Sequence, residues 1–168
     1  MQSSQTKRIL GLDPGYGRLG FGVLERDRQG EFLFVTCGVI TTAAGELMSE
    51  RLFEIAKDLR QLIVAHKPAL IVLEEIFFGK NTTTGLKVAE VRGVIQLLAA
   101  ENHITCIEVK PVEVKLAITG DGRADKTQIQ KMMLLLLKLQ QIPSPDDAAD
   151  ALAIAWTGAN KQRLLRLA

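Results

Sequence analysis

The chain has 168 residues and a mass of 18.4 kDa, which suits a single domain with a sizeable hydrophobic core. Hydrophobic residues make up 47% and charged residues 24%, which excludes a disordered or fibrous protein. A net charge of +2 is too small to indicate nucleic-acid binding by itself, and no apolar run approaches the roughly 18 residues that span a bilayer. We therefore expect one domain over residues 1–168, with a disordered tail over residues 1–7.

The first 40 residues predict a three-stranded meander. Residues 8–13 form an apolar run that ends at Pro14, where a central strand cannot comfortably continue. Two further strand-like runs, 19–26 and 31–40, are joined by the polar residues 27–30, which suit a hairpin turn.

The middle of the chain alternates between helical and strand patterns. Apolar residues recur every three to four positions over residues 47–66, which predicts an amphipathic helix. The dense apolar run 69–74 predicts a strand covered on both faces. A helix over 81–102 and a strand over 104–109 follow. Two helix-to-strand steps favour parallel connections and an α/β fold.

Three helices are predicted in the last third of the chain. Residues 111–118 begin with a proline, which is tolerated in a first helical turn. Asp125 can cap the next helix with Gln128 as its reciprocal partner. The last helix opens at residues 144–147 with a serine cap, a first-turn proline and first-turn acids.

Acidic residues follow or interrupt apolar sequence at three separate places. Asp13 ends the first strand, Glu74 and Glu75 end the fourth, and the last helix carries three acids in its first turns. The helical acids are Asp146, Asp147 and Asp150. Because residues three apart share a helix face, Asp147 and Asp150 point the same way. Gathered carboxylates would repel one another, so a hard divalent cation such as Mg²⁺ is expected between them.

More ordinary roles are also open for these acids. An aspartate before Pro-Gly is usually a turn residue, and Asp146 and Asp147 can simply cap a helix or complement its dipole. Asp150 is harder to explain in this way, because it lies past the first turn in an alanine-rich stretch. The residue pattern alone leaves open Glu74 against Glu75, and it does not exclude Asp146.

Three segments together resemble the RuvC family of Holliday-junction resolvases: GLDPG at 11–15, LEEIFFGKN at 73–81 and DAADALAIA at 147–155. The similarity runs in order over residues 8–155. It implies a ribonuclease H-like fold, with a mixed five-stranded sheet flanked by helices. It also implies an endodeoxyribonuclease that nicks two opposed strands of a four-way DNA junction, leaving 5′-phosphate and 3′-hydroxyl ends.

The resemblance assigns residues to roles. The family's four catalytic, metal-binding acids carry over onto Asp13, Glu74, Asp147 and Asp150, with two Mg²⁺ ions per site and Mn²⁺ as a substitute. Glu75 and Asp146 remain possible ligands or supporting groups.

Phe77 resembles the family's aromatic wedge at the junction centre, and such a ring can stack on an unpaired base. The resemblance favours Lys115 and Lys126 as DNA-phosphate contacts, and Arg123 is a further candidate. It also implies a homodimer and the branch-migration partners RuvA and RuvB. Because the helix over 81–102 is apolar on more than one side, we expect it to form an isologous dimer contact. We expect a cytoplasmic location and no membrane association.

Three other functions compete with this interpretation. Residues 13–20 also resemble a phosphate-binding hairpin of sugar kinases and actin-like ATPases, but those proteins need two such domains. A non-enzymatic junction-binding protein would not need four acids. Another ribonuclease H-like nuclease would share the chemistry but not the wedge or the dimer.

Overall fold

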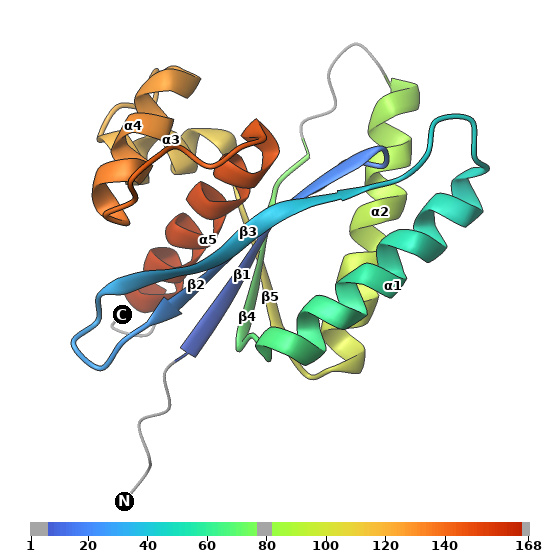
Figure 1. Ribbon diagram of the computed structural model, residues 1–168, viewed down its shortest axis with the longest axis horizontal. Coiled ribbons are helices and arrows are strands. Elements are labelled where there is room, and N and C mark those ends of the chain that lie inside the picture. The colour runs from blue at the N-terminus through green and yellow to red at the C-terminus, as the bar shows by residue number, and fades with distance from the viewer. Residues whose placement is uncertain (1–6, 77–81, 166–168) are drawn as a thin grey trace, which may run out of the picture.

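The computed structural model describes residues 7–76 and 82–165. One mixed five-stranded sheet separates two groups of helices, which confirms the predicted α/β fold class (Figure 1). The strands and helices are β1 (Lys7–Asp13), β2 (Arg18–Arg26), β3 (Phe32–Thr41), α1 (Met48–His66), β4 (Leu70–Glu74), α2 (Thr82–Glu101), β5 (Thr105–Val109), α3 (Pro111–Thr119), α4 (Lys126–Leu136) and α5 (Asp146–Leu165).

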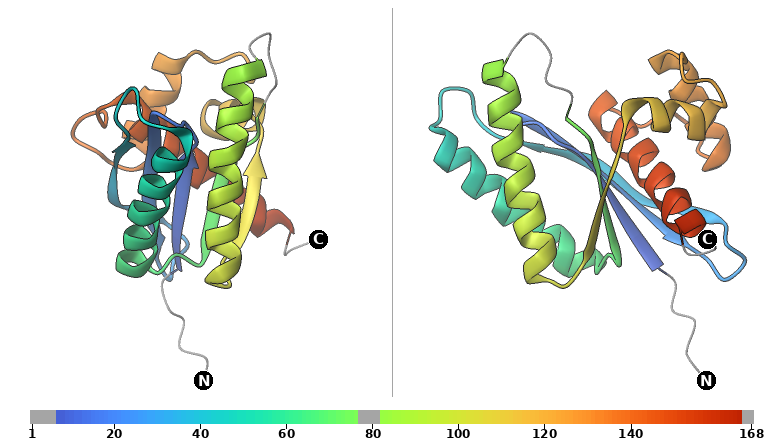
Figure 2. Two further views of the ribbon diagram at one scale, coloured as in Figure 1. Left: turned by 90° about the vertical axis from the view of Figure 1, so that its right-hand side faces the viewer. Right: turned by 180° about the vertical axis from the view of Figure 1, so that it is seen from behind.

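The strands lie in the order β3-β2-β1-β4-β5. The β1–β2 and β2–β3 pairs are antiparallel, as the predicted meander requires, and β4 and β5 add in parallel. Helices α1 and α2 cover one face of the sheet, while α5, with α3 and α4 beside it, covers the other (Figure 2). No helix in residues 7–76 or 82–165 combines the length and apolar character needed to cross a membrane.

Each face of the sheet has its own apolar core. On β1, Ile9 belongs to the core under α5, whereas Leu10 and Leu12 belong to the core under α1 and α2. On β4, Val72 faces α5 and Leu73 faces the other side. This alternation is the period of two expected of a strand covered on both faces.

Helix α5 lies unusually close to the sheet because glycines on β1 and β2 face it. A Cβ atom added to Gly11 would lie 2.2 Å from the carbonyl oxygen of Ala151, and one added to Gly20 would lie 2.1 Å from that of Asp147. No side chain fits at either position. The alanine-rich sequence of α5 completes this close contact, so its first turns lie directly over the end of β1 and β2.

Two details of the chain differ from the sequence-based expectation. The backbone N–H of Ala148 donates to the carbonyl of Pro145, and α5 begins at Asp146. Pro145 therefore precedes the helix, and Ser144 is not its cap. At the other end of the protein, Lys7 already belongs to β1, and the remainder of the predicted tail lies outside the described residues.

Candidate functional site

Strand alternation sends Asp13 and Glu74 to the same face of the sheet. Leu12 pairs with Leu73 across the parallel β1–β4 ladder, so the next residues, Asp13 and Glu74, end their strands side by side. Both leucines point toward α1 and α2. Asp13 and Glu74 therefore lie on the α5 side, while Glu75 is exposed.

The first turns of α5 bring Asp147 and Asp150 to these strand ends. Gly20, whose Cα faces the backbone of Asp147, is the cross-strand partner of Asp13. Asp147 and Asp150 are both partly buried. The four acids that the family resemblance selects are thus gathered at one edge of the sheet.

The charges of these acids act on one another. Burial, followed by the negative charges of Asp150 and Asp147, raises the pKa of Asp13 to about 6, although Lys126 opposes the change. Burial, followed by the charges of Asp13 and Asp150, raises the pKa of Glu74 to about 7. A cation held among these carboxylates would relieve the repulsion that raises both values.

Two of the acids are engaged by cationic side chains. Arg18 Nη2 lies 2.6 Å from Asp147 Oδ2, and Lys126 Nζ lies 2.9 Å from Asp150 Oδ2. Lys126 also lies 3.3 Å from Asp146, which is otherwise exposed. In this arrangement no three His, Cys, Asp or Glu side chains of the described residues are placed to hold a metal ion. Carboxylate oxygens are the ligands that a hard divalent cation prefers. To bind one here, the Asp147 and Asp150 side chains would have to rotate away from Arg18 and Lys126.

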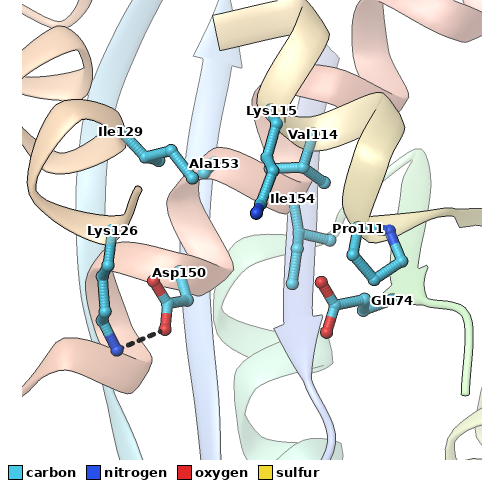
Figure 3. Close-up of a pocket in the computed structure, with 9 residues that line it drawn as sticks. All are labelled: Glu74, Pro111, Val114, Lys115, Lys126, Ile129, Asp150, Ala153 and Ile154. Atoms are coloured by element: carbon cyan, nitrogen blue, oxygen red, sulfur yellow. Dashed lines mark ion pairs between the residues drawn. The ribbon is translucent and has the colours of Figure 1, made fainter. Parts of the chain in front are cut away.

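A cavity of about 240 Å³ opens beside these acids. Glu74, Asp150, Lys115 and Lys126 supply its charged lining. In Figure 3 the Lys115 amine points toward the space between the carboxylates of Asp150 and Glu74. Negative groups that can hold cations and positive groups that can hold phosphate therefore share one hollow.

The predicted DNA-binding residue Arg123 is not among the described residues that line this cavity. It lies exposed in the α3–α4 loop, where its backbone N–H donates to Asp121. Asp125 caps α4 with Gln128 as predicted, which presents Lys126 at the helix N-terminus. Phe77 lies outside the described residues.

The deciding comparison is with protein families. Residues 9–158 match the RuvC family, described as crossover junction endodeoxyribonuclease RuvC. The chain belongs to the RuvC family. A RuvC from Petrotoga mobilis is 46% identical over 155 residues, which cover 92% of this chain and 94% of that protein. A RuvC from Roseiflexus sp. is 48% identical over 148 residues and 88% of each chain.

Solved RuvC structures share the fold. The Thermus thermophilus RuvC structure has a TM-score of 0.86 and 30% identity, covering 94% of this chain and 96% of that one. A second structure, T. thermophilus RuvC in complex with a Holliday junction substrate, has a TM-score of 0.85 and 27% identity over the same shares. These matches confirm the predicted ribonuclease H-like fold, and RuvC membership makes the chain a nuclease of a divalent-metal-dependent family.

Sequence reasoning missed two arginines that contact residues of the acid cluster, Arg92 and Arg18. Arg92 of α2 is buried; its Nη1 donates to the carbonyl of Glu74 and its Nη2 lies 2.6 Å from Glu108 Oε1. The sequence did hold a signal for Arg92: it is a charged residue among the buried apolar residues of α2, beside Val91 and Ile95. Arg18 begins β2 and neutralises Asp147, a contact between distant segments that has no signal in the sequence.

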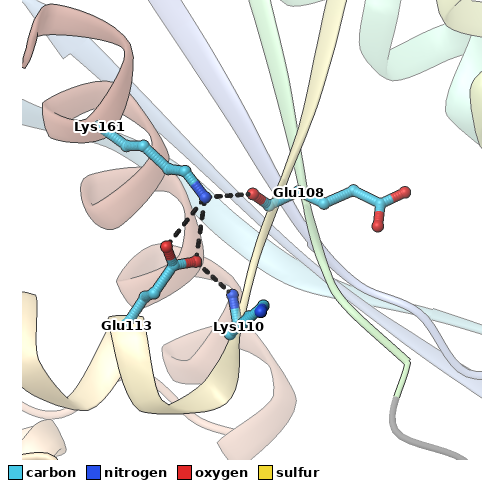
Figure 4. A network of polar contacts seen from close by, with 4 residues as sticks. All are labelled: Glu108, Lys110, Glu113 and Lys161. Carbon is cyan, nitrogen blue, oxygen red and sulfur yellow. Dashed lines mark hydrogen bonds and ion pairs between the residues drawn. The ribbon is translucent and has the colours of Figure 1, made fainter. Parts of the chain in front are cut away.

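A separate polar network fixes α3, and with it Lys115. Lys161 of α5 donates to the backbone carbonyl of Glu108 at 3.1 Å and to both carboxylate oxygens of Glu113 at 3.0 Å (Figure 4). Glu113 also accepts a 2.7 Å hydrogen bond from the backbone N–H of Lys110. The start of α3 is therefore tied to both β5 and α5.

The metal-free protein is expected to lose stability as the pH rises from about 4 to about 7. Asp13 and Glu74 have raised pKa values in the folded state, so in this range the folded protein binds more protons than the unfolded chain. The free energy of unfolding then falls with pH, by about 2 kcal/mol after allowance for partial solvation, or about 5 °C in melting temperature.

Thermal unfolding in EDTA between pH 4.5 and 7.5 measures this loss. The double variant Asp13→Asn/Glu74→Gln should melt higher than the wild type at pH 7.5 and show a flatter profile. Two superimposable profiles would show that these carboxyls do not titrate as described.

Proposed function

We propose that this protein resolves four-way DNA junctions by symmetric, metal-dependent hydrolysis of two opposed strands, leaving 5′-phosphate and 3′-hydroxyl ends. The observation that carries the proposal is the gathering of four carboxylates beside Lys115 and Lys126 in a chain of the RuvC family. Substrate choice is supported by the relatives, which are named as crossover junction nucleases, and by a related RuvC solved with a Holliday junction.

Asp13, Glu74, Asp147 and Asp150 are proposed as the metal ligands, with two Mg²⁺ ions per site and Mn²⁺ able to replace them. When bound, such ions supply an activated water nucleophile and stabilise the charge on the departing oxygen. The carboxylates are suited to this role because burial and mutual repulsion destabilise their charged forms unless a cation lies between them.

Arg18 and Lys126 have a matching part in the proposed reaction. Each neutralises one acid, through the pairs Arg18–Asp147 and Lys126–Asp150. If Asp147 and Asp150 held a metal ion instead, Arg18 and Lys126 would be available to bind backbone phosphates of the DNA. Metal loading and DNA binding would then support each other.

DNA binding is proposed to use Lys115, Lys126 and Arg123 on phosphates and Phe77 at the junction centre. Lys115 and Lys126 line the cavity of the acids. Such contacts hold the backbone in register but read no bases. Selectivity for a junction would depend on Phe77 and on the spacing of two sites in a dimer.

Replacing Lys115 by alanine should weaken junction binding about 10-fold and reduce the slope of log K against log salt by about one. The measurement is fluorescence anisotropy with a labelled junction in EDTA, where no strand is cut. Lys131→Ala is the matched control, because Lys131 is an exposed lysine on α4 outside the cavity lining. Equal losses in both variants would remove Lys115 from the site.

The active form is proposed to be a homodimer, with α2 as the contact. Leu86 and Leu97 lie eleven residues apart on α2, so they share a face, and they are 60% and 57% exposed. Leu86→Glu should give monomers in sedimentation velocity, whereas Leu135→Glu on α4, a leucine of similar exposure, should not. Association with RuvA and RuvB and a cytoplasmic location are further proposals that follow from the family.

A synthetic four-way junction tests the proposed function as a whole. With Mg²⁺, the purified protein should give paired nicks at symmetric positions that DNA ligase can reseal, and in EDTA it should give none. Cutting in EDTA, or equal cutting of linear duplex, would overturn the proposal.

A further inference from the structure

A second hollow lies beside the loop that follows Asp13. This cavity of about 230 Å³ is lined by Tyr16, Glu46, Met48, Arg51 and Lys87. Its walls come from the β1–β2 loop, the start of α1 and the second turn of α2. None of these side chains belongs to the acid site, so none of them is among the proposed metal ligands.

Two cations lie over one aromatic ring in the lining of this hollow. Arg51 Cζ lies 5.5 Å and Lys87 Nζ lies 5.1 Å from the centroid of the Tyr16 ring. Such contacts hold a cation in place without neutralising its charge. The loop itself is fixed, because Thr42 Oγ1 donates to the carbonyl of Tyr16 at 2.7 Å and the Thr42 N–H donates to that of Gly17 at 3.1 Å.

The charge of the hollow favours an anion. Within the described part of the chain, neither Arg51 nor Lys87 forms an ion pair with a carboxylate. Glu46 is the acid of the lining, and its Oε2 is buried without a hydrogen-bond partner. Two cations and one acid leave an excess positive charge, and a guanidinium next to an ammonium suits phosphate oxygens.

The position of the hollow connects it to the acid site. Tyr16 follows Asp13 by three residues, and α2, which carries Lys87, is the next element after β4 and Glu74. The N-terminal ends of α1 and α2 lie at the same end of the sheet as the acids but on the face opposite α5 (Figures 1 and 2). A DNA strand that passes over this edge would meet Lys115 and Lys126 on one side and the Tyr16 hollow on the other.

We propose that Tyr16, Arg51 and Lys87 form a second binding site for a backbone phosphate of the same DNA, on the far side of the sheet from Lys115 and Lys126. This inference rests on the proposed junction-resolving function. Two phosphate-binding sites, one on each side of the acids, would orient the phosphodiester bond that lies between the two bound phosphates. Glu46 opposes the bound phosphate and limits its affinity.

The test is the double variant Arg51→Gln/Lys87→Gln. Junction affinity, measured by fluorescence anisotropy in EDTA over a range of salt, should fall about 10-fold or more, and the slope against log salt should become shallower by about one. The single variant Glu46→Gln should bind the junction more tightly than the wild type. Circular dichroism and melting temperature confirm that each variant is folded.

The matched control is Lys7→Gln/Arg28→Gln, which removes one lysine and one arginine from the opposite end of the sheet. Both residues are exposed, at the start of β1 and in the β2–β3 turn. Equal weakening in the two double variants would overturn the site, because it would reflect net charge alone. Junction binding at wild-type strength by Arg51→Gln/Lys87→Gln would also overturn it.

Two further outcomes separate this site from its alternatives. Inorganic phosphate at millimolar concentration could raise the melting temperature of the wild type but not of Arg51→Gln/Lys87→Gln. If junction affinity is also unchanged in that variant, the occupant is a free anion and the DNA site is refuted. A wild type that neither binds nor cuts a junction refutes the proposed function. A wild type that does both, with a double variant equal to its control, refutes only the Tyr16 site.

Discussion

Replacing any one of the four gathered acids by its amide should lower the rate of junction cutting by roughly 1000-fold or more, while junction affinity is largely kept. The variants are Asp13→Asn, Glu74→Gln, Asp147→Asn and Asp150→Asn. Each keeps the size of the side chain but removes the charge that would hold a cation. Single-turnover cutting of a labelled junction gives the rate, and anisotropy in EDTA gives the affinity.

The neighbouring acids provide the controls. Glu75 is exposed directly after the end of β4, and Asp146 is 69% exposed where it pairs with Lys126. Glu75→Gln and Asp146→Asn should therefore cut within a few-fold of the wild-type rate. Normal cutting by one of the four amide variants would remove that residue from the catalytic set.

Gly20→Ala should destabilise the protein by about 3 kcal/mol or more and lower its melting temperature by roughly 10 °C. A Cβ atom at this position would lie 2.1 Å from the carbonyl oxygen of Asp147, and backbone cannot rotate away as a side chain can. The first turn of α5 must then move off β2, which carries Asp147 away from Asp13. Cutting should fall with stability, even at temperatures where the variant is folded.

Gly93→Ala is the matched control for this substitution. A Cβ atom at Gly93 meets nothing within 4 Å, and this glycine lies inside helix α2. Because Gly93 shares the proposed dimer face with Leu86 and Leu97, both glycine variants are compared in the monomeric Leu86→Glu background. Alanine at Gly93 should raise stability there by up to about 1 kcal/mol, because glycine is a poor helix former. Unchanged melting of Gly20→Ala would mean that α5 does not pack on the sheet as closely as described.

Local patterns in the sequence were enough to predict the strands and helices. Pro14, the turn before Glu31 and the Asp125 cap mark element ends through backbone chemistry that acts over a few residues. The start of α5 was predicted less well, because Ser144 and Pro145 also fit a cap and a first turn. The choice depends on which carbonyl accepts the hydrogen bond of Ala148.

The acid site was only partly predictable from residues alone. Glu74 and Glu75 are neighbours at the end of a run that is apolar on both faces, so the sequence pattern did not show which of them points to the site. The structure separates them through the register of β4 against β1, which places Leu73 with Leu12 under α1 and α2.

Contacts between distant segments could not be predicted. The pairing of Arg18 with Asp147, the hold of Arg92 on Glu74 and the stacking of Lys87 on Tyr16 each join parts of the chain that only the fold brings together.

Metal binding measured directly tests the central claim, that these four carboxylates hold the divalent ions. Free Mn²⁺ can be followed by electron paramagnetic resonance during titration of the protein with a junction that carries non-cleavable linkages. The wild type and Asp146→Asn should each bind two Mn²⁺ per chain, and Asp13→Asn or Asp150→Asn should lose at least one. Wild-type Mn²⁺ binding by both of these amide variants would contradict the account.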